Sequence, residues 1–534
     1  MRLGGRVVAA LLLVALLLGA NTGAGPASGT SAAPGGSEAL AAELRRLYAT
    51  PGSPGERWGR RPPEVDLPDG RRVGRDEAYR DRPDFVAAAG RLLRQAGEDA
   101  VLGAWLLGSA PAESTSAASS ALLEALRAAD PRVRYEAGRQ LGLMARSGRT
   151  LGTEARSVLR NLEEQGEPAE SGVARWALER RAGPSEAKLA QGFCRGVNWW
   201  HEEDRGDAGE ASFRRLAELG VDWVSIHTWD PLQRGVDSPD WAEPRRPLVI
   251  PNLKDLVRNA HAVGIKVMVK PHLEMRGYEP TDEERRVLRG PDEAARQKLY
   301  ARIRADWEAR PRVWHNDIEM KTESDWRAWF SRYEAYVLSY VDQAVAAGAD
   351  AFCVGRETDK AAIAREGDWR RLIRQVRDRF RGPLTYSANF DGYQRIPFWD
   401  ALDVVGISAY FPLSTAGAPS SEELAAGWER IMAPLESFAR RQNRRVVFTE
   451  VGYPALATAA QRPWEENAGA ADVWLQSRLY EAALQAVAKR PFLAGSFFWL
   501  WEGTSRPPFR DSSFSIQDKP AAFVMARWYG GRKE

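Results

Sequence analysis

Cysteine and histidine are scarce in this chain, with two and five residues in 534. Cys194 and Cys353 lie in predicted strands and nothing in their spacing brings the thiols together, so we expect buried apolar side chains in place of a disulfide. The histidines show neither H-x-H nor H-E-x-x-H spacing, which argues against a zinc hydrolase, and we expect no metal or other cofactor. A Gly-x-Gly-x-x-Gly turn is also missing after the first predicted strand, which argues against a dinucleotide-binding fold.

An excess of charge of one sign is missing as well, since 75 lysines and arginines stand against 72 aspartates and glutamates. Both signs are interspersed along predicted helices, so we expect no nucleic-acid partner. The one long apolar run, 7–18, follows Arg2 and Arg6 and precedes Gly19-Ala20, which predicts a signal peptide over 1–20 and a secreted, extracytoplasmic protein. No later run reaches the roughly 18 apolar residues of a membrane span, so none is expected in the mature chain.

The first third of the chain predicts a linker and a helical domain. Residues 21–37 are mostly Gly, Ala, Ser and Pro, as in a flexible linker, and 38–183 show apolar residues at helical spacing. Within that domain Asp130-Pro-Arg-Val-Arg is echoed forty residues later, with Val133 matching Val173. The period resembles HEAT-type repeats, and an ordinary helical bundle is the alternative. We expect these helices to dock on the rest of the chain or to bind another protein.

Strands and helices alternate over the remaining residues, 189–534. Eight apolar strands are predicted at 192–199, 221–227, 265–270, 351–357, 384–388, 403–410, 446–450 and 493–499. Eight such units in about 340 residues predict an α/β fold, a closed (β/α)8 TIM barrel that follows the all-α, HEAT-like domain. Catalytic groups of such barrels lie after the carboxyl ends of the strands.

Two of these strands end in a carboxylate. Glu357 closes the fourth strand and Glu450 the seventh, so both side chains are expected at the barrel mouth. Two carboxylates across a pocket suit glycosidic cleavage, in which one protonates the leaving oxygen and the other attacks the anomeric carbon or activates water. For a single glutamate, a salt bridge to Arg or Lys is the alternative.

Several longer runs resemble one enzyme family over residues 192–527. These runs are Val267-Met-Val-Lys-Pro-His272, Trp329-Phe-Ser-Arg-Tyr333, Leu384-Thr-Tyr-Ser-Ala-Asn389, 398–410, Phe448-Thr-Glu-Val-Gly-Tyr-Pro454, Ser496-Phe-Phe-Trp-Leu-Trp501 and Phe514-Ser-Ile-Gln-Asp-Lys-Pro520. Together they are similar to glycoside hydrolase family 113 of the retaining clan A, whose characterised members act on β-1,4-mannan. The resemblance implies a polysaccharide or oligosaccharide substrate, with Glu357 as acid/base and Glu450 as nucleophile of a double displacement.

The resemblance also implies residues that contact the sugar or the nucleophile. Tyr410 is expected to donate a hydrogen bond to Glu450, with barrel packing as its alternative role. The further substrate-binding candidates are Trp199, His227, Trp229, Lys270, His272, Arg356, Asn389, Trp499 and Trp501. The two histidines among them could instead be buried and satisfied within the core.

Arg356 departs from the family pattern, because a small polar residue, commonly Asn, usually precedes the acid/base. An arginine there could lower the pKa of Glu357, bind a substrate carboxylate or point elsewhere. The alternative function is therefore a catalytically degenerate, carbohydrate-binding or scaffolding barrel.

Overall fold

The computed structural model describes residues 36–49, 64–66, 72–74, 79–80, 82–110, 114–178, 189, 192–200, 209–242, 248–275, 281–290, 292, 295–299, 301–303, 314–465, 471–488, 490–502 and 512–530. These residues form two compact units. The barrel unit lies within Leu189–Asn467 and Ala482–Thr504, and the helical unit within Pro26–Lys188, Ala468–Glu481 and Ser505–Glu534.

The core of the barrel unit is a closed sheet of eight parallel strands. In chain order they are β3 (Cys194–Trp200), β4 (Trp223–His227), β6 (Lys266–Lys270), β8 (Ala351–Arg356), β9 (Leu384–Asn389), β10 (Val405–Ser408), β11 (Val446–Val451) and β12 (Leu493–Glu502). Each strand pairs with the next, and β12 pairs with β3 to close the barrel. All eight coincide with predicted strands, so the predicted TIM barrel is confirmed.

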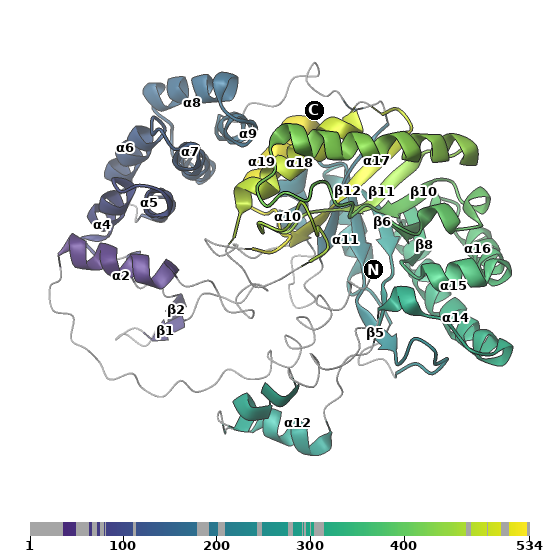
Figure 1. Ribbon diagram of the computed structural model, residues 1–534. Coiled ribbons are helices and arrows are strands. Elements are labelled where there is room, and N and C mark those ends of the chain that lie inside the picture. The colour runs from purple at the N-terminus through teal and green to yellow at the C-terminus, as the bar shows by residue number, and fades with distance from the viewer. Residues whose placement is uncertain are drawn as a thin grey trace. The chain divides into compact units, whose positions relative to one another are not determined.

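Helices α10 (Glu210–Glu218), α11 (Leu253–Ala262), α12 (Asp282–Arg289), α14 (Glu323–Ala347), α15 (Asp359–Ala364), α16 (Glu366–Arg379) and α17 (Ser421–Gln442) belong to the same unit. Figure 1 shows α14 to α17 around the outside of the strands. Gly220, Gly264 and Gly348 follow α10, α11 and α14 with φ of 83°, 67° and 77°. Glycine adopts this left-handed conformation without a Cβ clash, which is why these helices end there.

A short parallel pair, β5 (Asp230–Gln233) and β7 (Leu273–Met275), extends the sheet beyond β4 and β6. Neither strand is expected from the sequence. Their pairing places Asp230 opposite Leu273 and Pro231 opposite Glu274. Glu274 is therefore held beyond the carboxyl end of β6, on the side where the strand-end glutamates lie.

The barrel interior is apolar toward the strand starts and polar toward the strand ends. Its apolar layer is made of Met268, Ala351, Cys353, Val447 and Phe497, with Cys194, Trp223 and Val404 packed against it. Burial raises the pKa of the Cys353 thiol to about 11 and that of Cys194 to about 12, as expected of cysteines that fill space. Nearer the strand ends, the Ser387 hydroxyl lies 3.0 Å from that of Ser408.

The helical unit contains α2 (Ser37–Ala49), the hairpin pair β1 (Glu64–Asp66) and β2 (Arg72–Gly74), α4 (Phe85–Leu93), α5 (Glu98–Leu107), α6 (Thr115–Ala125), α7 (Pro131–Arg146), α8 (Thr153–Gln165) and α9 (Pro168–Ala177). Helices α4 to α9 follow one another in a row (Figure 1). Helix α5 packs on α7 and α7 on α9, and each of these three also packs on the helix before it. This stacking of helix pairs is compatible with the predicted HEAT-like repeat, which stays a prediction.

Asp130 begins α7 as expected, because its side chain accepts a hydrogen bond from the backbone N–H of Arg132 at 2.9 Å and Pro131 occupies the first turn. The C-terminal helix α19 (Pro520–Tyr529) packs on α9 in the same unit. The Phe523 ring lies 5.2 Å from that of Trp176 and 5.8 Å from that of Tyr135. Part of the predicted barrel domain, 505–534, thus belongs to the helical unit.

The predicted signal peptide, 1–20, and most of the linker, 21–37, lie outside the described residues, although Ser37 already begins α2. Within the described residues we find no helix with the length and apolar character of a membrane span.

Candidate active site

Glu450 reaches the barrel mouth through an irregularity in β11. Along β10, Ile407 pairs with Phe448 but the next residue, Ser408, pairs with Glu450, so Thr449 is an extra residue in the ladder. Such a β-bulge re-aims the side chains that follow it. The bulge allows Thr449 to bond Ser387, at 2.5 Å between hydroxyls, while the next residue, Glu450, still turns toward the site.

The Glu450 carboxylate is buried and held by two donors. Lys270 Nζ donates to Oε1 at 2.7 Å, and the Tyr410 hydroxyl donates to Oε2 at 2.9 Å. The predicted Tyr410 contact is thus present. Both bonds stabilise negative charge on Glu450, because an ammonium and a phenol act as donors to an ionised carboxylate. Burial lowers the pKa of Lys270, although the charge of Glu450 opposes that effect.

Glu357 follows β8 in a strained conformation. Its φ is 47°, in the left-handed region that non-glycine residues rarely occupy, at a cost on the order of 1 kcal/mol. The β8–β9 register also shifts between Cys353 and Arg356. Unlike a regular strand, this segment directs the adjacent Arg356 and Glu357 side chains to each other, with Arg356 Nη1 donating to Glu357 Oε2 at 3.0 Å.

Four charged or titratable side chains form one buried network around Glu357. His315 contacts Glu274 Oε2 through Nδ1 at 3.0 Å and Glu357 Oε2 through Nε2 at 3.3 Å. Arg356 bridges the same two carboxylates, with Nη2 on Glu274 Oε1. We call Glu274, His315, Arg356 and Glu357 the acid network. It contains two carboxylates, one guanidinium and one imidazole in direct contact.

The network sets the protonation of its members. Burial alone would raise the pKa of Glu357, but the Arg356 guanidinium and the hydrogen bond from His315 lower it to about 2. Burial lowers the pKa of His315, yet Glu274 more than offsets this, so that pKa lies above its ordinary value. Of the three roles considered for Arg356, the structure shows the first, an ion pair that lowers the pKa of Glu357.

The charges of Glu357 and Glu450 both affect the Tyr410 hydroxyl. Burial and the charges of Glu450 and Glu357 together raise the pKa of Tyr410 well above its ordinary value. Ser408, which pairs with Glu450 in the sheet, also lowers the pKa of Glu357 through a side-chain hydrogen bond. The carboxylates from β8 and β11 therefore belong to one site at the barrel mouth.

Aromatic rings and imidazoles line the side of the site formed by β3, β4, β6 and β12. His227 stacks on His272 with ring centroids 4.8 Å apart, and Trp499 lies 5.0 Å from His227. Lys270 Nζ lies 5.6 Å from the Trp499 ring centroid. Trp200, which sequence reasoning missed, lies 5.3 Å from His227.

His272 is fully buried, and neither of its ring nitrogens has a hydrogen-bond partner among the described residues. Burial and the charges of Arg356 and Lys270 lower its pKa well below the ordinary value, so the ring is neutral. Its Nε2 lies 3.8 Å from Glu450 Oε1. A neutral imidazole beside the second carboxylate offers one donor and one acceptor to a substrate hydroxyl.

Two predicted substrate contacts are placed differently. Trp199 and Trp501 both donate their indole N–H to the Ser212 hydroxyl of α10 at 2.9 Å, so they pack between strands and helix, and the expectation that they face a sugar needs correction. Asn389 is buried, and its Oδ1 accepts a hydrogen bond from Phe390 N at 2.9 Å. Trp229 lies near the site, 6.1 Å from Trp200.

Sequence reasoning also missed Glu274 and His315. Glu274 lies two residues after His272, which the alternation of a strand would have placed on the same side. For His315 the sequence carries no signal, because it lies in a three-residue 3-10 turn, His315–Asp317, after a long connection. Within the described ranges no group of three or more His, Cys, Asp or Glu side chains is arranged to hold a metal ion.

Comparisons with known proteins agree with this fold. Residues 303–519 match the model of Glycoside Hydrolase Family 113. The family 113 β-mannanase AaManA of Alicyclobacillus acidocaldarius, solved in complex with ManMIm, is 27% identical with a TM-score of 0.51, over 64% of this chain and 98% of that one. A second family 113 β-1,4-mannanase complex is 22% identical with a TM-score of 0.50, over 63% of this chain and 98% of that one, a likeness of fold alone. No curated protein sequence matches this chain.

The family match supports a glycoside hydrolase, and it includes both strand-end glutamates, since Glu357 and Glu450 fall within 303–519. The chain therefore carries a closed TIM barrel that is similar to glycoside hydrolase family 113.

Proposed function

We propose that this protein is a secreted, retaining glycoside hydrolase that cleaves a β-1,4-linked, mannan-like polysaccharide by double displacement. The observation that carries the proposal is the pair of glutamates at the ends of β8 and β11, one held by Lys270 and Tyr410 and the other by His315. The name β-mannanase, printed for the relative at 27% identity, favours mannan as the substrate. The apolar run over 7–18 favours secretion.

Glu450 is the nucleophile in this mechanism. Its carboxylate is fixed through both oxygens, so it is oriented before a substrate arrives. In the first step one oxygen bonds the anomeric carbon as the bond to the leaving oxygen breaks, which gives a glycosyl ester. In the second step water attacks the same carbon and releases Glu450 as a carboxylate.

Glu357 is the acid/base, and its proton must come from the acid network because the ligand-free carboxyl has a pKa of about 2. When a sugar enters and draws Arg356 away from Glu357, burial again favours the neutral acid. The imidazolium of His315 then passes its Nε2 proton to Glu357 Oε2, and Glu357 protonates the leaving oxygen. In the second step Glu357 takes a proton from the attacking water and returns it to His315 Nε2, which restores the imidazolium and the carboxylate.

The Arg356–Glu357 ion pair favours a second candidate function, a carbohydrate-binding barrel without turnover. If Arg356 stays on Glu357 when a sugar binds, no acid protonates the leaving group. The rings of Trp200, Trp229 and Trp499 would still bind a sugar in such a protein.

Hydrolysis assays separate the two candidates. Wild type, Glu450→Ala and Glu357→Ala are incubated with mannan, glucomannan, xylan and β-glucan, with Glu436→Ala, on α17, as the matched control. We expect mannan hydrolysis by wild type and the control, and a loss of about 10⁴-fold or more for Glu450→Ala. The first product observed by NMR should keep the β-anomeric configuration.

Equal inertness of wild type and Glu450→Ala on all four polymers would overturn the hydrolase proposal. If mannan then bound both proteins equally without release of sugar, the binding function would stand. A first product of inverted configuration would contradict the double displacement, although the protein would still be a hydrolase.

A further inference from the structure

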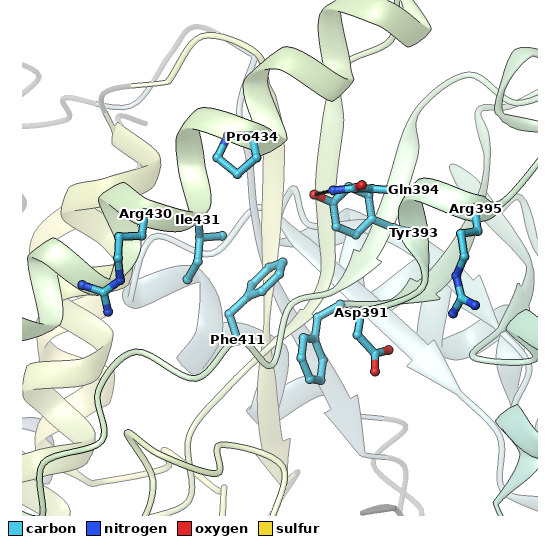
Figure 2. A pocket seen from close by; sticks show the side chains of 9 residues that line it. Asp391, Tyr393, Gln394, Arg395, Phe411, Arg430, Ile431 and Pro434 are labelled. Atoms are coloured by element: carbon cyan, nitrogen blue, oxygen red, sulfur yellow. Dashed lines mark hydrogen bonds between the residues drawn. The ribbon is translucent and has the colours of Figure 1, made fainter. Parts of the chain in front are cut away.

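A groove lies beside the active site and is not used by the mechanism above. It has a volume of about 410 Å³ and lies between the loop after β9, Phe411 in the loop after β10, and helix α17. Figure 2 shows Phe411 in the middle of the lining residues, with Arg430 and Ile431 of α17 to one side and Asp391, Tyr393 and Arg395 to the other.

Phe390 and Phe411 place one edge of the groove next to residues at the barrel mouth. Asn389 ends β9 and Phe390 follows it, and Phe411 follows Tyr410, which donates to Glu450. Because these lining residues are the next in sequence after two residues at the barrel mouth, the groove opens on the catalytic face of the barrel.

The lining chemistry fits a sugar. Phe390 and Phe411 give the groove two aromatic rings, 5.6 Å apart, which suit the apolar face of a pyranose. The exposed side chains of Asp391, Gln394 and Arg395 supply both acceptors and donors at its edge. Sugar hydroxyls both donate and accept, so a neutral polysaccharide matches this mixture of an aromatic floor and polar edges.

Helix α17 adds a backbone acceptor. Pro434 lies inside α17, and a proline has no N–H to donate to the carbonyl oxygen four residues earlier, that of Arg430. Arg430 and Pro434 both line the groove. The carbonyl that lacks this N–H partner therefore belongs to a residue that lines the groove.

We propose that this groove is a distal subsite that binds further sugar residues of the polysaccharide chain cleaved between Glu357 and Glu450. The inference rests on the proposed function and deepens it, because it makes the enzyme select long chains over short ones. Occupancy of the groove adds binding energy that is lost for a substrate too short to reach it.

Kinetics on substrates of different length test the subsite. Wild type, Gln394→Ala and Arg395→Ala are compared on mannohexaose and on 4-nitrophenyl β-mannoside, with Arg441→Ala on the same helix α17 as control. Both groove side chains are exposed, so their removal spares the core. We expect kcat/KM on mannohexaose to fall about tenfold, mainly through KM, while kcat/KM on the short substrate stays within about twofold of wild type.

If kcat/KM of a groove variant falls by the same factor on both substrates, or does not fall on mannohexaose, the subsite is overturned. The proposed hydrolase function is unaffected by that result. If wild type cleaves neither substrate, the proposed function has failed, and calorimetric binding of mannohexaose to wild type, Gln394→Ala, Arg395→Ala and Arg441→Ala then tests the groove. Weaker binding by the two groove variants than by Arg441→Ala supports the subsite. Equal binding by all of them overturns it.

Discussion

Arg356 controls the charge balance of the acid network. With Glu274 and Glu357 ionised and His315 protonated, the four groups sum to zero charge. Buried ions are tolerated when they are paired in this way, and removal of one partner leaves an uncompensated charge. The network is thus stable as found in the ligand-free protein, but the ionised Glu357 that it requires is the wrong form for protonating a leaving group.

The substitution Arg356→Asn should move the pH dependence of hydrolysis. The guanidinium holds the pKa of Glu357 at about 2, so its removal lets burial raise that pKa. Glu357 then keeps its proton to higher pH, and the alkaline limb of kcat/KM should shift upward by one or more units on substrates with a poor leaving group. The measurement is a pH–rate profile of wild type and variant.

A substrate with a good leaving group is the internal control, because its cleavage needs little acid assistance and its alkaline limb should move less. A folded variant whose alkaline limb coincides with that of wild type on both substrates would remove Glu357 from the acid role.

At this scale the sequence predicted the two carboxylates, Lys270 and Tyr410, because each ends a recognisable apolar strand. It could not predict how they are aimed. The bulge at Thr449 and the φ of 47° at Glu357 depend on pairing with neighbouring strands, which leaves no local sequence signal. The choice of Trp199 over Trp200 was wrong for a simpler reason, since adjacent strand residues face opposite sides. Trp200 packs on His227, whereas the Trp199 indole donates to Ser212.

At the scale of elements, Ser212 joins helix α10 to two barrel strands. Its hydroxyl accepts hydrogen bonds from Trp199 of β3 and Trp501 of β12, and all three residues are buried. The two indoles thus share one acceptor. They brace α10 at the point where β12 closes the barrel against β3.

Ser212→Ala should destabilise the protein without changing the chemistry. Two buried indole donors lose their acceptor at a cost of about 1–3 kcal/mol each. We expect an unfolding midpoint in urea lowered by a corresponding amount, and kcat within about twofold of wild type at a temperature where both are folded. A large loss of kcat at unchanged stability would instead indicate that Trp199 and Trp501 contact the substrate.

Helices α9 and α19 approach each other closely at Gly172. A Cβ at this position would overlap the carbonyl oxygen of Phe523. Gly172→Ala should therefore separate the two helices and cost about 1–3 kcal/mol in unfolding free energy. Gly367→Ala is the matched control, because it also lies in a helix and its Cβ would have no neighbour within 4 Å.

For Gly367→Ala we expect unchanged or slightly higher stability, by up to about 1 kcal/mol, since alanine favours the helix. Denaturant titrations of the Gly172→Ala and Gly367→Ala variants measure both unfolding free energies. Equal stability of the Gly172→Ala variant and wild type would contradict the close approach of α9 and α19.

The elements themselves were largely predictable. All eight barrel strands and the glycine stops after α10, α11 and α14 follow from apolar runs and turn residues. The strands β5 and β7 were not found because they span four and three residues, and β5 contains Pro231. Runs that short carry no periodicity to detect.

At the scale of the whole molecule, buried Asp359 links stability to pH. Burial raises the pKa of Asp359 to about 7, although its hydrogen bonds from Tyr386 and from the backbone of Asn389 oppose the shift. The folded pKa lies above the unfolded value. The contribution of Asp359 to the free energy of unfolding is therefore fully present below about pH 4. It is lost as the pH rises through about 7, and in total it is on the order of 4 kcal/mol.

Asp359→Asn should remove this slope. The amide keeps the shape of the neutral acid, so the variant should gain stability over wild type as the pH increases from 5 to 8, with little difference near pH 4. Unfolding free energies in urea at several pH values provide the measurement, and Asp342→Asn on the exposed face of α14 controls for the loss of one surface charge. Parallel pH profiles of wild type and Asp359→Asn would show that the buried carboxyl does not titrate in this range.

The path of the chain between the two compact units limits how the protein can be divided. Residues 468–481 and 505–534 return to the helical unit after the barrel has begun, and the change of unit between Glu481 and Ala482 falls inside the helix α18 (Val473–Ala488). A gene fragment that starts at residue 189 would encode every barrel strand, yet it would leave Trp474 and Phe523 without the Tyr135 ring on which both pack. We therefore expect such a fragment to aggregate unless those apolar faces are redesigned. The barrel strands of this chain cannot simply be expressed without the helical unit or fused to another protein.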